Sequence, residues 1–232
     1  MEPIVLTNPE GPVRIAPEAG ASAVYIVLQD AVQACESDWE IVLPEGASLR
    51  MVFLSLDGTL LRNRLRVSLQ GRHAACELSG LCLADGSQEM DYDIVLTHEV
   101  PQCRSTQLFK NIVGGHAVTR FNGLIKVVPD AQQTEAYQAN HNLLTSETAK
   151  AYTRPQLEIY ADDVKCSHGA TIGRLNPDEL FYMRSRGIPQ AEARLLQQLA
   201  FCSEVLENIP SAGLREPLQQ RVEERLRQLA WG

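Results

Sequence analysis

Leu65-Arg66-Val67-Ser68-Leu69 has the pattern that decides the fold of this chain. Its apolar and polar residues alternate, which places the apolar side chains on one face of an extended strand and the polar ones on the other. Similar short runs precede it at residues 24–28, 39–43 and 49–54. Because period two is typical of half-buried strands, the chain up to about residue 170 is predicted to be rich in β-structure.

Turn-forming residues separate these runs, at Pro44-Glu45-Gly46, Asp57-Gly58, Gly71, Gly80 and Asp85-Gly86. Several short strands at regular spacing predict a β-sandwich, a β-barrel or a β-helix, and the spacing alone does not choose among them. No sharp repeat motif is visible in the sequence, so a β-helix would need irregular coils.

The pattern changes after Leu175 to one that predicts three helices. Asn176-Pro177-Asp178-Glu179 offers an N-cap, a proline at the first helical position and a glutamate at the third, which predicts a helix over Pro177–Arg186. A second helix is expected from Pro189 to about Asn208, and a third over Leu214–Leu229 after the break at Pro210. Their apolar stripes are formed by Leu195, Leu199, Cys202, Leu206 and Ile209, and by Leu218, Val222, Leu226 and Leu229.

The 232 residues have an acidic balance, with a net charge of −8. This composition lacks the basic surface that binds nucleic acid or anionic membranes, so neither is expected as a partner. The segment Met1–Leu6 has no basic region and no continuous apolar run, so no secretion signal is expected. No apolar stretch in the sequence is long enough to span a bilayer. We therefore expect a cytoplasmic protein without membrane contact.

The six cysteines fall in no CxxC pair, and in a reducing cytoplasm most are predicted to be small buried hydrophobic residues. The sequence also lacks the phosphate-loop, dinucleotide-binding, HExxH and GxSxG signatures, so an enzyme is not expected. Gly114-Gly115-His116 is predicted to be a turn between two strands. His73, His98, His116 and His141 are isolated in sequence and are predicted to be satisfied polar residues.

Cys166-Ser167-His168 is the one segment with a candidate metal site. In an extended chain, Cys166 and His168 project to the same face with their Cα atoms about 7 Å apart. A thiolate and an imidazole at this separation could bind one iron or zinc ion, or two edges of an iron–sulfur cluster. Two ligands do not complete a site, so a partner, a substrate or water must supply the rest. From the pattern alone, a packed cysteine beside a hydrogen-bonded histidine is the favoured alternative. Asp162 and Asp163 are predicted to form a turn.

Several longer stretches resemble the SufD group of the SufB/SufD family of iron–sulfur cluster assembly proteins. The strongest is Arg154–Gly173, which contains Cys166 and His168. The resemblance extends over about residues 90 to 209 and includes Gln138–Thr145, Glu179–Ile188, the F-x-G-x-I-x-V run at Phe121–Val127, and the segment around His98, Ser105 and Lys110.

The resemblance implies a non-catalytic scaffold subunit of the SufBCD machine. It implies a right-handed parallel β-helix core over residues 1–175 that pairs with SufB, followed by a small C-terminal α-helical domain over residues 176–232 that docks the ATPase SufC. Cys166 and His168 match the cysteine and histidine of the family, as candidate ligands shared at the SufB-type interface. No cofactor is expected to bind stably in isolation, and a transient iron–sulfur cluster is expected in the assembled complex.

The chain departs from this family because SufD proteins have a helical N-terminal region before the β-helix, whereas Met1 lies close to the β-rich core. It is expected to be a shortened form or a short paralogue. Exposed β-helix edges make a homodimer in isolation an alternative assembly. The helical stripes could pack on the β-helix instead of a partner. Two other functions stay open: a stand-alone β-fold metalloenzyme that uses Cys166 and His168, and a purely structural interaction module.

Overall fold

The computed structural model describes residues 2–30 and 33–229, which form two parallel sheets and three helices. The strands are β1 (Ile4–Thr7), β2 (Gly11–Ile15), β3 (Ser22–Asp30), β4 (Cys35–Leu43), β5 (Ser48–Asp57), β6 (Leu60–Leu69), β7 (Ala75–Ala84), β8 (Glu89–His98), β9 (Arg104–Val113), β10 (Val118–Val127), β11 (Thr134–Leu144), β12 (Lys150–Ile159) and β13 (Val164–Gly173). The helices are α1 (Pro177–Ser185), α2 (Gln190–Leu206) and α3 (Ala212–Gln228).

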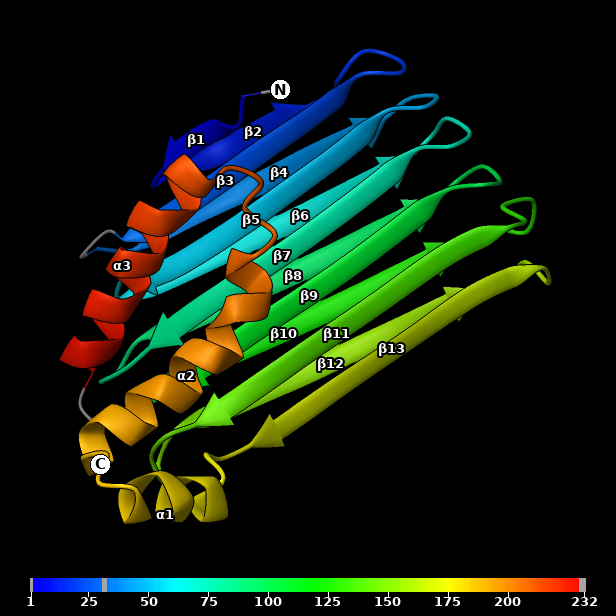
Figure 1. The fold of residues 1–232 in the computed structure, drawn as a ribbon. Helices are drawn as coiled ribbons and strands as arrows, with labels where there is room; N and C mark the ends of the chain where they lie inside the picture. The colour runs from blue at the N-terminus through cyan, green and yellow to red at the C-terminus, as the bar shows by residue number, and fades with distance from the viewer. Residues whose placement is uncertain (1, 31–32, 230–232) are drawn as a thin grey trace.

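Odd-numbered strands form one sheet, in the order β1-β3-β5-β7-β9-β11-β13, and even-numbered strands form the other, from β2 to β12. Neighbours in both sheets run parallel, so two successive strands make one coil, and the chain climbs about six coils from β2 to β13 (Figure 1). The predicted parallel β-helix is therefore confirmed, whereas a sandwich or barrel is excluded.

The length of one coil changes along the chain, which explains why no repeat motif is visible in the sequence. Matching positions lie 26 residues apart at Ser22 and Ser48, and 31 residues apart at Gln107 and Gln138. From β3 to β13 the strands have 9 to 11 residues, so the turns between them take up most of the difference. A sequence repeat with a drifting period has no fixed spacing to detect.

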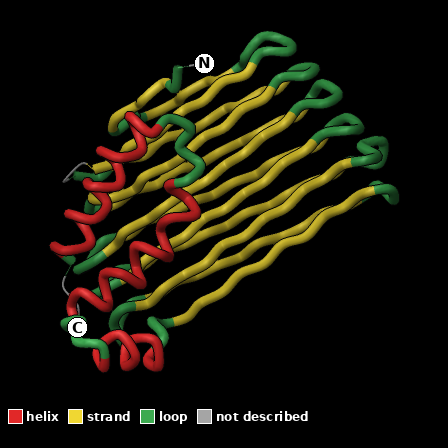
Figure 2. Tube along the Cα trace, in the orientation of Figure 1, coloured by secondary structure: helices red, strands yellow, loops and turns green. Residues whose placement is uncertain are grey.

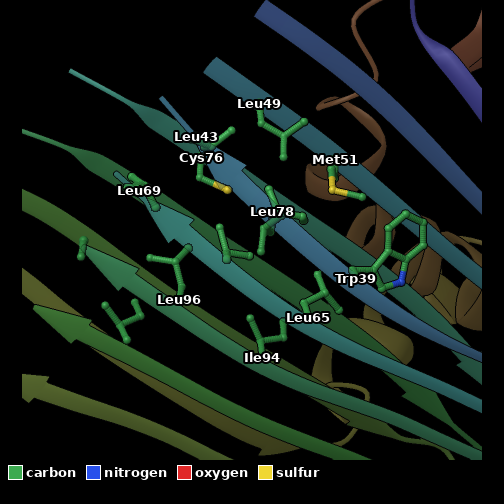
Figure 3. Close-up of a cluster of buried hydrophobic side chains, with 14 of the residues drawn as sticks. Trp39, Leu43, Leu49, Met51, Leu65, Leu69, Cys76, Leu78, Ile94 and Leu96 are labelled. Carbon is green, nitrogen blue, oxygen red and sulfur yellow. The ribbon is translucent and has the colours of Figure 1, made fainter. Parts of the chain in front are cut away.

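The interior between the sheets is filled by inward side chains from alternate positions of each strand (Figure 3). In Leu60–Leu69, the predicted alternation is observed, since Leu65, Val67 and Leu69 are buried. A column of rings runs through the core, with centroids 4.9–5.8 Å apart: Trp39, Phe53, Tyr92, Phe109 and Phe121. Aromatic pairs at this separation stabilise a core beyond the contribution of their buried area.

Gly80 lies inside β7, so its predicted role as a turn residue is wrong. A Cβ atom at this position would lie 2.3 Å from Cδ1 of Phe109, on the paired strand β9. The glycine is needed because a ring occupies the space that a side chain would take. The other predicted turns, including the one at Gly114–His116, lie between strands, except that Asp57 is the last residue of β5.

Helices α2 and α3 lie across the outer face of the seven-stranded sheet (Figure 2). The predicted stripes are confirmed, since Leu206, Ile209, Val222 and Leu226 are buried against sheet residues such as Leu54. Each helix begins and ends within three residues of the predicted bounds. Burying a leucine side chain contributes about 1.5–3 kcal/mol, so these stripes stabilise the β-helix itself. The alternative that they pack on the β-helix is correct.

Polar contacts also hold the helices on the sheet. Arg225 of α3 donates to the backbone carbonyl of Leu56 at 2.8 Å, and Asn208 Nδ2 donates to Ser79 Oγ at 2.8 Å. Lys110, on the outer face of β9, is nearly buried and forms an ion pair with Glu204 of α2. No helix in the described part of the chain is long and apolar enough to cross a membrane.

Candidate functional site

The last coil of the β-helix is exposed. β12 and β13 are edge strands of their sheets, and among the described residues no further strand pairs with them. An edge strand leaves backbone N–H and C=O groups available to another chain. We call residues 150–173 the open end. Large exposed apolar side chains gather here, namely Tyr152, Ile159, Tyr160 and Ile172.

Cys166 and His168 both lie on β13, on its inward face. Val164 and Cys166 are half-buried and pack against the interior cluster, while Lys165 between them is exposed. The next inward position, His168, is exposed because no coil of the described residues covers it. β13 is a regular strand, so the predicted extended segment with a sulfur and an imidazole on one face is confirmed.

The Cys166 thiol is held in its protonated form. Burial raises its pKa, and a hydrogen bond from the Ala136 backbone opposes this in part. Metal ligation requires a thiolate, so an incoming cation must displace this proton. The thiol is therefore a weaker nucleophile near neutral pH than a fully exposed thiol.

A sulfur and an imidazole are ligand types that fit iron or a cluster edge, and together they would supply two ligands. Within residues 2–30 and 33–229, no group of three or more His, Cys, Asp or Glu side chains could hold a metal ion. A metal at Cys166 and His168 would therefore need further ligands from outside the described residues. Asp162 and Asp163 are exposed in the turn between β12 and β13, as predicted.

The other histidines are dispersed over the fold. His98 is fully buried and bonded through Nε2 to Ser105 Oγ at 2.8 Å. His141 lies on the outer face of β11, with Nδ1 2.9 Å from Thr171 Oγ1. His73 and His116 lie between strands. In the part of the chain that the structure describes, none of these joins Cys166 and His168 in a group of three metal-binding side chains.

Sequence reasoning missed the polar interior beneath His168. Gln107 of β9, Gln138 of β11 and His168 of β13 occupy matching positions on three neighbouring parallel strands. Gln138 Nε2 donates to Gln107 Oε1 at 2.9 Å, and both glutamines are almost completely buried. The sequence gives no signal for this column, because the pairing register between strands about 30 residues apart cannot be deduced from period two.

A second exposed surface lies at the helices. Helix α1 has no buried residue, and its Phe181 and Tyr182 are 72% and 60% exposed. Together with α2 it forms a groove lined by Tyr182, Met183, Leu196 and Ala200, with Asp178, Glu179 and Gln197 as its polar lining. α1 lies at the last-coil end of the stack (Figure 1). The open end and this groove therefore lie at the same end of the molecule (Figure 1).

Comparison with known proteins shows which family this chain resembles. Residues 11–201 match the family model described as the SUF system FeS cluster assembly, SufBD core domain. The chain is 38% identical over 187 residues to the iron–sulfur cluster assembly protein SufD of Escherichia coli, covering 81% of this chain and 44% of that protein.

Two further relatives are similar at comparable levels. An iron–sulfur cluster assembly SufBD family protein of Synechocystis is 40% identical, over 75% of this chain and 38% of its own length. The Arabidopsis thaliana protein named ABCI7, chloroplastic, is 35% identical over 93% of this chain and 46% of its own length. The chain thus spans less than half the length of each of these relatives.

Proposed function

Because this chain belongs to the SufBD family of iron–sulfur cluster assembly proteins, we propose that it is a SufD-like scaffold subunit without a reaction of its own. The observation that supports this most is the open end. The coil that presents Cys166 and His168 is the last one of the stack, and among the described residues no further strand covers it. A scaffold that shares a site with another subunit needs such an arrangement.

The open end is the surface we assign to a SufB-like subunit. Edge strands β12 and β13 offer unpaired backbone groups, and Tyr152, Tyr160 and Ile172 offer apolar side chains around them. Aromatic residues on an exposed surface favour association, because they bury a large area at a small entropic cost. Pairing of β-edges would extend both sheets into the partner.

The nascent iron–sulfur cluster would be assembled on the complex and passed on, and it would not be a resident cofactor of this chain. Cys166 and His168 would hold one edge of it, and the partner subunit would supply the remaining ligands. The raised pKa of the Cys166 thiol keeps the sulfur protonated until iron arrives. Ligation is then coupled to release of a proton. The free chain would retain no cluster, and the complex would work in a reducing cytoplasm that keeps the thiol free.

The SufC-like ATPase is assigned to α1 and the groove it forms with α2. The stripes of α2 and α3 are buried on the sheet, so they are not available for docking. Phe181 and Tyr182 remain exposed, and the groove beside them is apolar. An aromatic pair next to an apolar groove is a surface that a partner helix or loop can bury.

A binding experiment with two variants tests both assignments on the full chain. Ile172→Ser with Tyr160→Ser should abolish capture of the SufB-like subunit of the same host and leave capture of the SufC-like ATPase intact. Phe181→Ser with Tyr182→Ser should do the reverse, and each variant is the control for the other. The assignments are contradicted if neither variant loses an interaction. They are also contradicted if one variant loses both interactions. Sedimentation of the free chain shows whether a second copy occupies the open end instead.

A further inference from the structure

Two polar atoms of the glutamine column, Gln107 Nε2 and Gln138 Oε1, have no hydrogen-bond partner among the described residues. Gln138 is 3% exposed, and among the described residues its Oε1 has no hydrogen-bond partner. An unsatisfied buried acceptor costs about 1–3 kcal/mol, so a donor that reached Gln138 Oε1 would be stabilised there. The question is which donor could reach this oxygen.

The direction of the amide is set by its other contacts. Gln138 Nε2 donates to Gln107, on the preceding coil, at 2.9 Å. A Cβ atom on Gly123 would lie 2.5 Å from the same nitrogen, so the amide rests against the glycine backbone of β10. The amide nitrogen of Gln138 points toward the preceding coil, so its carbonyl oxygen is available to a residue of the following coil.

His168 is the residue at the matching position on the following coil. Neighbouring parallel strands lie about 4.8 Å apart, and the step from Gln138 to His168 equals the step that the Gln107 bond already spans. Its imidazole has two ring nitrogens, one of which can donate while the other binds a cation. Metal-binding histidines generally donate their second N–H to a carbonyl or carboxylate oxygen.

We propose that Gln138 is the positioning residue for His168, and this rests on the ligand role given to His168 above. Gln138 Oε1 accepts the N–H of one ring nitrogen and thereby selects the tautomer and the ring direction. The other nitrogen then faces the exposed side of the open end, next to the Cys166 sulfur. Gln107 and Gly123 hold Gln138 in place from below, so the support for the exposed ligand is buried in the β-helix.

Cobalt(II) titration of the full chain under anaerobic conditions tests this without any partner or activity. Thiolate and imidazole ligands give cobalt characteristic absorption bands. Gln138→Met should weaken cobalt binding about 10- to 100-fold, which is the usual cost of removing such a supporting hydrogen bond. Gln138→Glu retains an acceptor oxygen and should restore most of the affinity.

Gln107→Met is the matched control, because it breaks the same glutamine pair and leaves the Gln138 carbonyl in place. It should change the melting temperature about as much as Gln138→Met does, with a clearly smaller loss of cobalt affinity, because the acceptor oxygen is retained and Gly123 still packs against the amide. Equal losses of affinity in the two variants, or none in Gln138→Met, would overturn the positioning role. A wild-type titration that binds no cobalt, or is unchanged by His168→Ala, contradicts the ligand role itself and is a separate outcome.

Discussion

Gly80 and Phe109 lie opposite each other on the paired strands β7 and β9, and the ring of Phe109 fills the space where a Gly80 side chain would be. This contact keeps Phe109 in line between Tyr92 and Phe121, with centroid separations of 4.9 and 5.1 Å. The column continues toward the coils that support the open end. The packing of the middle coils and the placement of the last ones are therefore linked.

Gly80→Ala should destabilise the protein by about 1–3 kcal/mol, because the added methyl group overpacks the core against the ring. In the background of Phe109→Leu, the same substitution should cost much less, since the two positions are coupled. Chemical denaturation of the four proteins measures this. An equal cost in both backgrounds would show that the ring is not the obstacle.

His98 should make the stability depend on pH. Burial lowers its pKa to about 4, from an ordinary value of 6.5, so the folded state keeps this ring neutral where the unfolded state is protonated. Its contribution is complete above pH 6.5 and is lost as the pH falls toward 4, by roughly 3 kcal/mol in total.

Urea denaturation between pH 7 and 4 provides the measurement for His98. The His98→Gln variant should lose less stability over this interval than the wild type does. His116→Gln, at an exposed turn position, should retain the wild-type pH dependence. Parallel curves for the wild type and His98→Gln would mean that the buried ring is not responsible.

Cys166 should be the cysteine that reagents reach in the native protein, since the other five are buried. Its raised pKa leaves little thiolate near pH 7, so alkylation should be slower than that of a small free thiol and should accelerate as the pH rises. Mass spectrometry after iodoacetamide treatment identifies the site. Labelling of a buried cysteine at the same rate would contradict the observed packing.

The sequence predicted the strands and the helices but not how they are arranged. Alternation in Leu60–Leu69 identifies the buried face of a strand, and the stripe through Leu206 identifies the buried face of a helix. Neither pattern indicates which surface that face packs on. Paired positions lie 21 residues apart at Ile4 and Tyr25 and 32 residues apart at Val118 and Lys150, and a drifting period hides that relation. The β-helix therefore came from resemblance, and the structure confirms it.

The candidate site was predictable only where it depends on local sequence. Parity along one strand is a local property, so the shared face of Cys166 and His168 could be deduced directly. The exposure of His168 and its alignment with Gln138 depend on strand register and on the absence of a covering coil among the described residues. Both are tertiary properties that no local pattern encodes.

The most direct test of the scaffold role is the amount of iron and acid-labile sulfide in the anaerobic complex of this chain with its SufB-like and SufC-like partners. The double variant Cys166→Ser and His168→Ala should assemble normally and lose most of its cluster. Lys165→Ala with Ser167→Ala, on the opposite face of β13, should keep it. A full complement of cluster in an intact complex of the double variant would contradict the role of the open end.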